Sequence, residues 1–138
     1  YCEAALELPD GTIVTGKNSP LFHSASACII NAIKRLAGLP DNIHLLPASV
    51  VQSLTELKRS YLGSNSPSLN VQEVLVALGI SAATNPAAAA GVEMLPKLRG
   101  CDMHLTHVPG SGDEVGLRKL GVLFTTDATP TSQGYFLR

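Results

Sequence analysis

Polar side chains that could hold a small anion gather between a predicted strand and the helix that follows it. The stretch PDGTIVTGKNSPLFHSASACIINAIKRLAG, residues 9–38, places an amine, an amide, an imidazole and several hydroxyls there. A second predicted helix begins in the same way, after another predicted strand. The first N–H groups and the dipole of a helix favour negative charge, so two such helix starts on one side of a sheet would form an anion pocket. The residues we assign to this ligand-binding pocket are Lys17, Asn18, Ser19, His23, Ser24 and Ser49.

The same residues have a second interpretation, in which no ligand is involved. Ser19, Ser24 and Ser49 then cap helices, which is the usual role of serine at these positions. His23 is then a solvated or hydrogen-bonded loop residue. No GxxxxGK[ST] or GxGxxG run accompanies these residues, so the sequence does not predict a dedicated nucleotide cradle. Both interpretations stay open at this point.

A second group that could do chemistry lies in CDMHLTHV, residues 101–108. In a strand, alternation places Asp102 and His104 on one face, where a carboxylate can orient an imidazole for acid–base catalysis. Alternation also fits a second interpretation, in which Asp102 and His104 belong to a polar strand face that is exposed to water or to another domain. His104 and His107 fall on opposite faces and make a poor metal pair.

The cysteines give no sign of a metal site or a disulfide framework. Cys2, Cys28 and Cys101 are odd in number and far apart, and no CxxC motif occurs. We therefore predict no metal and no cofactor, and reduced, largely buried thiols in a cytoplasmic protein.

Composition restricts the class of partner. The chain has 138 residues, enough for a single α/β domain over 1–138. A formal net charge of −1, 4% aromatic residues and no tryptophan argue against nucleic acid as a partner, and no apolar run is long enough to span a membrane. Hydrophobic residues reach 45% and charged residues only 15%, so we expect part of the surface to face a partner. The start at Tyr1, without methionine, predicts a piece of a longer polypeptide.

Periodicity predicts strands that alternate with helices. This order predicts a three-layer α/β sandwich with a mixed central sheet flanked by helices. An Asn70 and Glu73 pair predicts a capping box, and Asn85 before Pro86 predicts another helix start. Predicted strands cover 2–8, 12–15, 43–46, 101–108 and 122–126, and predicted helices cover 25–36, 48–61, 71–78, 87–95 and 113–120, before a turn-rich tail over 127–138.

Five stretches resemble the C-terminal part of a bacterial family, domain-of-unknown-function family 1846. They are LPDGTIVTGKNS, NAIKRLAGLPDNIHLL, EVLVALGISAATNP, LPKLRGCDMHLT and RKLGV. The resemblance covers nearly the whole chain, in the same segment order, and is weakest after Asp127. It implies a cytoplasmic bacterial protein several times longer, with this piece at its C-terminal end, and it implies no particular activity.

The topology also resembles the cytidine-deaminase type of α/β fold, through IVTGKN before a helix and IHLLPASVV after it. That chemistry needs a zinc-bound water and a glutamate that shuttles protons. The corresponding triplet here is His23-Ser24-Ala25 or Ala27-Cys28-Ile29, and neither contains glutamate. The later segment 47–51 offers no thiolate. The resemblance therefore implies a related topology without the zinc site or its deamination.

We expect an accessory or structural domain that packs on the rest of its own chain or on a second copy, and that contributes to a site for a small anionic metabolite. One alternative is a transferase or hydrolase that acts on a phosphorylated or carboxylated small molecule. In that case Asp102 and His104 would supply acid–base catalysis and would have to share one cleft with the predicted anion pocket. Another alternative is a self-association module, based on the small residues of NPAAAAG, 85–91.

Overall fold

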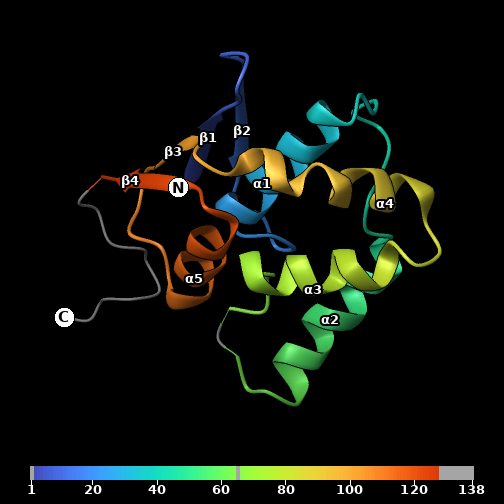
Figure 1. Cartoon of the computed structure of the whole chain (residues 1–138). Helices are drawn as coiled ribbons and strands as arrows, with labels where there is room; N and C mark the ends of the chain where they lie inside the picture. Colours follow the sequence, from blue (N-terminus) through green and yellow to red (C-terminus); the bar gives the residue numbers. More distant parts are fainter. Residues whose placement is uncertain (1, 65, 128–138) are drawn as a thin grey trace.

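A four-stranded mixed sheet forms one side of the molecule in the computed structural model, which describes residues 2–64 and 66–127 (Figure 1). Its order is β2-β1-β3-β4. Strand β1 pairs antiparallel with β2 and with β3, and β3 pairs parallel with β4. The strands are β1 (Glu3–Glu7), β2 (Ile13–Lys17), β3 (Asp102–Leu105) and β4 (Leu123–Thr126).

The first two strands form the predicted hairpin. Asp10 accepts a hydrogen bond from the backbone N–H of Thr12 at 2.9 Å, and Gly11 has φ +87°, a conformation that glycine adopts without strain. The predicted strand over 12–15 differs from the structure at both ends, because β2 begins at Ile13 and continues through Gly16 to Lys17. Gly16 is needed for a different reason: a Cβ there would overlap the backbone N of Cys28. The glycine therefore lets the strand approach the first helix closely.

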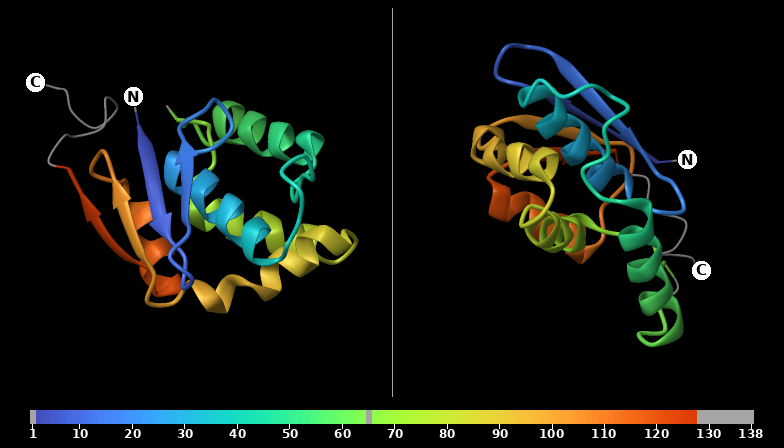
Figure 2. Two further views of the ribbon diagram at one scale, coloured as in Figure 1. Left: turned by 90° about the horizontal axis from the view of Figure 1, so that it is seen from above. Right: turned by 90° about the vertical axis from the view of Figure 1, so that its right-hand side faces the viewer.

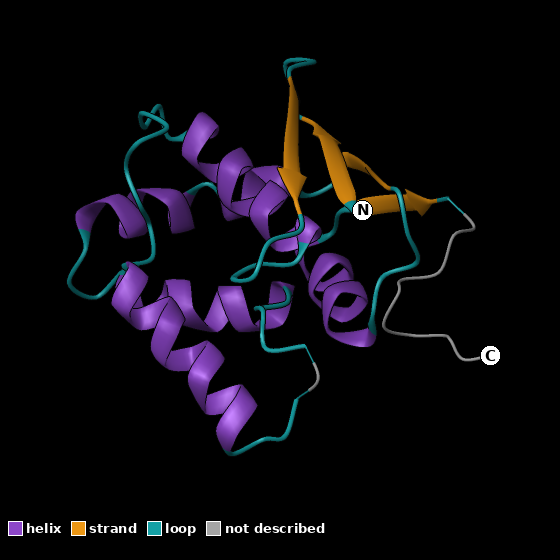
Figure 3. Cartoon of the chain, turned by 180° about the vertical axis from the view of Figure 1, so that it is seen from behind, coloured by secondary structure: helices purple, strands orange, loops and turns teal. Residues whose placement is uncertain are grey.

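In the part of the chain that the structure describes, five α-helices and one 3₁₀ turn lie beside the sheet (Figure 2). Helix α1 packs on β1 and β2, α5 lies against β4, and α3 contacts α1, α4 and α5. Helix α2 lies farther out, at the edge of the molecule (Figure 3). The helices are α1 (Ser24–Leu36), α2 (Ala48–Ser60), α3 (Val71–Ser81), α4 (Pro86–Glu93) and α5 (Ser111–Leu120), with the 3₁₀ turn η1 at Leu95–Leu98.

The core lies between the helices and one face of the sheet. Ala4, Leu6, Met103 and Leu105 alternate along the strands and are buried, while the residues between them point the other way and are mostly exposed. The α/β class and the mixed sheet are thus confirmed. The predicted third layer differs from the structure, because the described helices cover one face and leave polar side chains such as His104 on an open second face. The similarity to the deaminase topology stays a prediction.

The predicted buried strand at 43–46 is wrong, because this segment is a loop. Leu45 is buried, yet its carbonyl accepts hydrogen bonds from the Ser81 hydroxyl at 3.0 Å and from the Asn85 amide at 3.4 Å. Side chains thus satisfy a backbone group that a neighbouring strand would otherwise pair. The predicted tail beyond residue 127 lies outside the described residues.

Candidate functional site

The carboxyl ends of three strands meet at one edge of the sheet. Since β2 and β3 are both antiparallel to β1, and β4 is parallel to β3, these three run in one direction. Helix α1 follows β2 and helix α5 follows β3, so both helices begin at this edge. In open α/β sheets, ligands bind outside the carboxyl ends of the strands. This edge is therefore the first place to look for a site.

A polar cavity of about 430 Å³ is found at this edge. We call it the serine pocket, and it is lined by Asn18, Ser19, Pro20, Arg59, Ser66, Pro67 and Ser68. The lining offers hydroxyls, an amide and one guanidinium. Arg59 donates to Glu56 at 2.8 Å, but both side chains are more than half exposed, so this ion pair is weak and can open. The pocket thus combines neutral donors with one positive charge.

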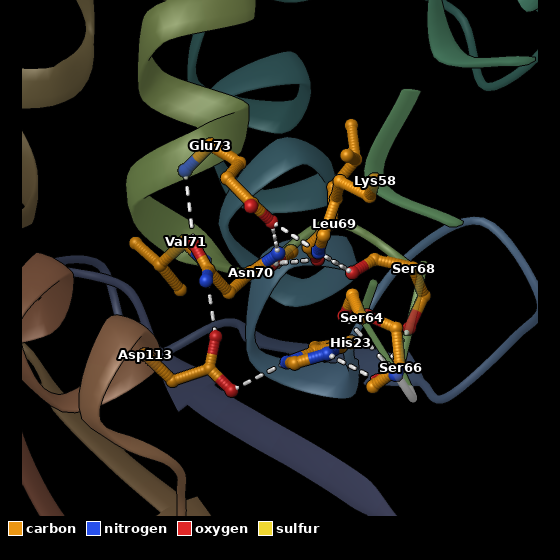
Figure 4. Close-up of polar contacts among 11 residues, drawn as sticks. His23, Lys58, Ser64, Ser66, Ser68, Leu69, Asn70, Val71, Glu73 and Asp113 are labelled. Atoms are coloured by element: carbon orange, nitrogen blue, oxygen red, sulfur yellow. Dashed lines mark hydrogen bonds and ion pairs between the residues drawn. The ribbon is translucent and has the colours of Figure 1, made fainter. Parts of the chain in front are cut away.

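A Ser–His–Asp chain stands at one wall of the pocket (Figure 4). His23 Nε2 lies 3.3 Å from Ser66 Oγ, and His23 Nδ1 lies 2.8 Å from Asp113 Oδ2. The side chain of Asp113 is only 2% exposed, and its other oxygen accepts the backbone N–H of Val71 at 2.9 Å. The carboxylate is thereby fixed by two donors from different segments.

This hydrogen-bond network selects one tautomer of neutral His23. The carboxylate of Asp113 can only accept, so Nδ1 carries the proton that is shared with it. Nε2 then has a free lone pair directed at the Ser66 hydroxyl. His23 is therefore arranged to accept a proton from Ser66.

The serine loop, residues 64 and 66–68, is held against the start of α3. Lys58 Nζ donates to the Ser68 carbonyl and to Glu73 Oε1, both at 2.7 Å. Glu73 and Asn70 form the predicted capping box, which is confirmed in both of its hydrogen bonds. Ser66 Oγ and Ser68 Oγ lie 3.4 Å apart. The loop is thus connected by side chains to two helices.

Two further buried polar atoms belong to the loops and helix starts of this edge. Ser24 Oγ and His107 Nδ1 have no hydrogen-bond partner among the residues that the structure describes. Burial lowers the pKa of His107; the charge of Asp113 opposes this effect and His23 adds to it. Burial thus favours the neutral form of this imidazole.

The structure brings some of the predicted anion-binding residues together and separates others. Asn18 and Ser19 line the serine pocket, and His23 contacts its Ser66. Lys17 lies on the open face of the sheet, 3.9 Å from Glu3. Ser49 is exposed in the first turn of α2, about 15 Å along the helix from Arg59.

The predicted acid–base residues lie elsewhere on the molecule. Asp102 and His104 are on the open face and line a separate cavity of about 230 Å³. His104 bonds to Thr125 at 2.7 Å and to Asp127 at 2.9 Å, so the carboxylate that contacts its ring is that of Asp127. The structure therefore does not bring Asp102 and His104 into one cleft with Asn18 and Ser19.

Sequence reasoning missed four residues of the site: Arg59, Ser66, Ser68 and Asp113. The serines occur in a stretch that reads as an ordinary polar loop, and Arg59 reads as a helix-end cation. Asp113 could have been predicted from the sequence, because it lies in the first turn of a helix that follows a predicted strand.

Metal-binding groups and reactive thiols do not add to this site. Within residues 2–64 and 66–127, no group of three His, Cys, Asp or Glu side chains is placed to hold a metal ion. All three cysteines are free, and burial raises the pKa of Cys28 to about 12. No helix among the described residues has the length and apolar character needed to cross a bilayer.

Comparison with known proteins places the chain among bacterial relatives. Residues 2–136 match the family model described as "Domain of unknown function DUF1846, C-terminal". A UPF0371 protein of Corynebacterium aurimucosum is 47% identical over 90% of this chain and 25% of its own length. UPF0371 proteins of Clostridium botulinum (strain Alaska E43) and Clostridioides difficile are 47% and 44% identical, each over 96% of this chain and 26% of their own length. The chain thus spans about a quarter of these relatives.

Proposed function

This chain belongs to the family of the DUF1846 C-terminal domain, and we propose that it supplies a larger protein with a pocket for a small anionic metabolite. The observation that supports this most directly is the lining of the serine pocket at the carboxyl edge of the sheet. The hydroxyls of Ser19 and Ser68 and the Asn18 amide can donate hydrogen bonds to phosphate or carboxylate oxygens. Arg59 adds the charge, and its planar fork suits these anions.

The size of the pocket fits a small molecule. A volume of about 430 Å³ falls in the range of small-molecule sites. Arg59 supplies the positive charge of the lining, and a bound anion would replace the exposed Glu56 carboxylate that pairs with it at 2.8 Å.

Titration of the full-length protein with inorganic phosphate tests this proposal. We expect saturable shifts of the Asn18 and Ser68 amide signals by NMR, and binding about tenfold weaker in Arg59→Gln. The matched control is Arg118→Gln, because Arg118 is also an exposed helix arginine paired with a glutamate, at 2.9 Å. Equal affinity in wild type and Arg59→Gln, or equal losses in both variants, would contradict the proposal.

A second role, in packing, is favoured by an apolar surface on α2 and α3. Tyr61, Leu62, Val76 and Ile80 are between 65% and 81% exposed, and a groove of about 420 Å³ runs between the two helices. Patches of this kind mark contact surfaces. We assign the contact to the rest of the longer polypeptide, since three quarters of each relative lies outside the matched part.

Hydrogen exchange in the full-length protein tests this packing role. We expect α2 and α3 to be more protected there than in the isolated chain, at every protein concentration. Val76→Asp should remove the extra protection, whereas Glu56→Gln, on the exposed side of α2, should keep it. Protection that rises with protein concentration would instead indicate a second copy and contradict the assignment.

The cytoplasm is the compartment that we propose for the protein. The three cysteines are free and two of them are buried, which suits a reducing environment.

A further inference from the structure

We propose that Ser66 is a nucleophile activated by His23 and Asp113. With these residues the protein would hydrolyse an ester of a small anionic molecule that binds in the serine pocket. This inference rests on the proposed anion pocket, which would hold the charged end of the substrate next to Ser66. It goes further by assigning a reaction class and a role to each of the three side chains.

The three residues come from distant parts of the chain. His23 precedes α1, Ser66 lies in the loop before α3, and Asp113 lies in the first turn of α5. The contacts join the hydroxyl to the imidazole at 3.3 Å and the imidazole to the carboxylate at 2.8 Å. This is the connectivity of a nucleophile, a base and an orienting group, which is recognised by geometry and not by sequence order. The hydroxyl–imidazole contact, at 3.3 Å, is slightly longer than the range of about 2.6–3.2 Å for such pairs, as is common before substrate binds.

The close packing of α3 against α5 fixes the position of Asp113. A Cβ at Gly112 would overlap the Asn70 side chain, and one at Gly116 would overlap Val71. These two glycines let the starts of the helices approach, and the backbone N–H of Val71 reaches the Asp113 carboxylate at 2.9 Å. The orienting group is therefore held rigidly, although the nucleophile lies in a loop.

The surroundings of Ser66 suit an anionic ester. Ser66 and Arg59 line the same cavity. A substrate whose carboxylate or phosphate binds to Arg59 would therefore have its ester group inside the pocket, near Ser66. Ser68 Oγ lies 3.4 Å from Ser66 Oγ, and its hydroxyl would be a donor for the oxyanion that forms when Ser66 attacks the ester. His23 is 23% exposed at its side chain, so water can reach it for the second step.

The reaction balances with water as the only co-reactant. Ser66 Oγ attacks the ester carbonyl carbon while its proton moves to His23 Nε2. The bond between the carbonyl carbon and the leaving oxygen then breaks, and His23 returns the proton to the departing alcohol. Water attacks the resulting acyl-serine, again giving a proton to His23, which passes it to Ser66 Oγ as the acid is released. One ester and one water thus give one acid and one alcohol.

Labelling with a fluorophosphonate probe tests the nucleophile directly. In the full-length protein we expect covalent modification of the peptide that contains Ser66, measured by mass spectrometry. Ser66→Ala should abolish it, and His23→Gln should slow it by about 100-fold. Ser49→Ala is the control, because Ser49 is an exposed serine outside the pocket, and it should be labelled like wild type. Circular dichroism melts of each variant identify any that fail to fold, and His23→Asn then replaces His23→Gln.

Hydrolysis of two esters tests the substrate class. The mono-4-nitrophenyl ester of succinic acid carries a carboxylate, and 4-nitrophenyl acetate does not. We expect Arg59→Gln to raise KM for the charged ester by about tenfold, and Arg118→Gln, outside the pocket, to hydrolyse both esters like wild type. No labelling at Ser66, or labelling equally fast in His23→Gln, would overturn the assignment.

The results separate this inference from the proposed function. Phosphate binding that depends on Arg59, without labelling of Ser66, would retain the pocket and overturn the nucleophile. Labelling of Ser66 without phosphate binding would support the nucleophile and contradict the anion pocket.

Discussion

His23 Nδ1 and Asp113 Oδ2 lie 2.8 Å apart, although ninety positions separate the two residues in the sequence. The contact joins the start of α1 to the first turn of α5, and Val71 adds the start of α3 through the same carboxylate. A buried carboxylate with two donors connects three helices at one point. It therefore acts on stability as well as on the proposed chemistry.

Replacement of Asp113 by alanine should destabilise the protein strongly. It leaves the buried Val71 N–H and the partly buried His23 imidazole without their acceptor, and losses of this kind cost about 3 kcal/mol. Urea unfolding measures the free energy of unfolding of each variant. The adjacent control, Glu114→Ala, removes only an exposed ion pair with Arg118 and should cost less than about 1 kcal/mol. Similar losses in the two variants would show that Asp113 has no special structural role.

Alanine at Gly16 and alanine at Gly79 should change stability in opposite directions. At Gly16 the added Cβ would overlap backbone atoms of Cys28 and Ser24, which cannot move without displacing α1 from the sheet. We expect a loss of at least about 2 kcal/mol in the free energy of unfolding. Gly79 lies within α3 with open space around it, so alanine should add about 0.5–1 kcal/mol by favouring the helix. Thermal melts monitored by circular dichroism would show a lower Tm for the first variant and a higher Tm for the second.

Local patterns were sufficient to predict most of the elements. Asn70 and Glu73 satisfy each other across one helical turn, so the spacing of two residues determines this helix start. Alternation likewise predicted β1 and β3, since one face of each strand is buried. The loop at 43–46 could not be recognised in this way, because an apolar run does not reveal that Ser81 and Asn85 will satisfy the Leu45 carbonyl.

The candidate site was only half predictable for a related reason. Asn18, Ser19 and His23 follow a strand directly, and position along the chain reveals them. Ser66 reaches the same place from a loop, and its role depends on a contact 43 residues away. No local spacing encodes that contact, since it arises from the packing of α3 against α1.

Acid should destabilise the protein through His107. Burial lowers the pKa of this imidazole below its ordinary value of 6.5, with Asp113 and His23 as the nearby charges. As pH falls below about 6.5, His107 becomes protonated in the unfolded chain but stays neutral in the folded chain. The free energy of unfolding therefore decreases by up to about 1.4 kcal/mol per pH unit. The decrease ends when the pH reaches the lowered pKa of His107 in the folded protein. Above pH 7 the effect vanishes.

Urea unfolding of His107→Gln at pH 7.5 and at pH 5.5 measures this contribution. The difference between the two values should be smaller in the variant than in wild type, whatever the absolute cost of the substitution. His44→Gln is the control, since His44 is exposed, and it should retain the wild-type difference. An unchanged difference in His107→Gln would mean that His107 titrates normally.

Alkylation should distinguish the three thiols in the native protein. Burial raises the pKa of Cys28 to about 12 and also raises the pKa of Cys101, whose thiolate is further disfavoured by Asp102 and Glu7. The thiolate is the reacting species, so at pH 8 very little of either residue can react, and Cys28 is in addition fully buried. Iodoacetamide should therefore modify Cys2, which is partly exposed, well before the other two.

Peptide mass spectrometry over a time course measures the order, and unfolding in urea should make the three rates equal. Fast modification of Cys28 in the folded protein would show that α1 separates readily from β2, and would contradict the close contact at Gly16.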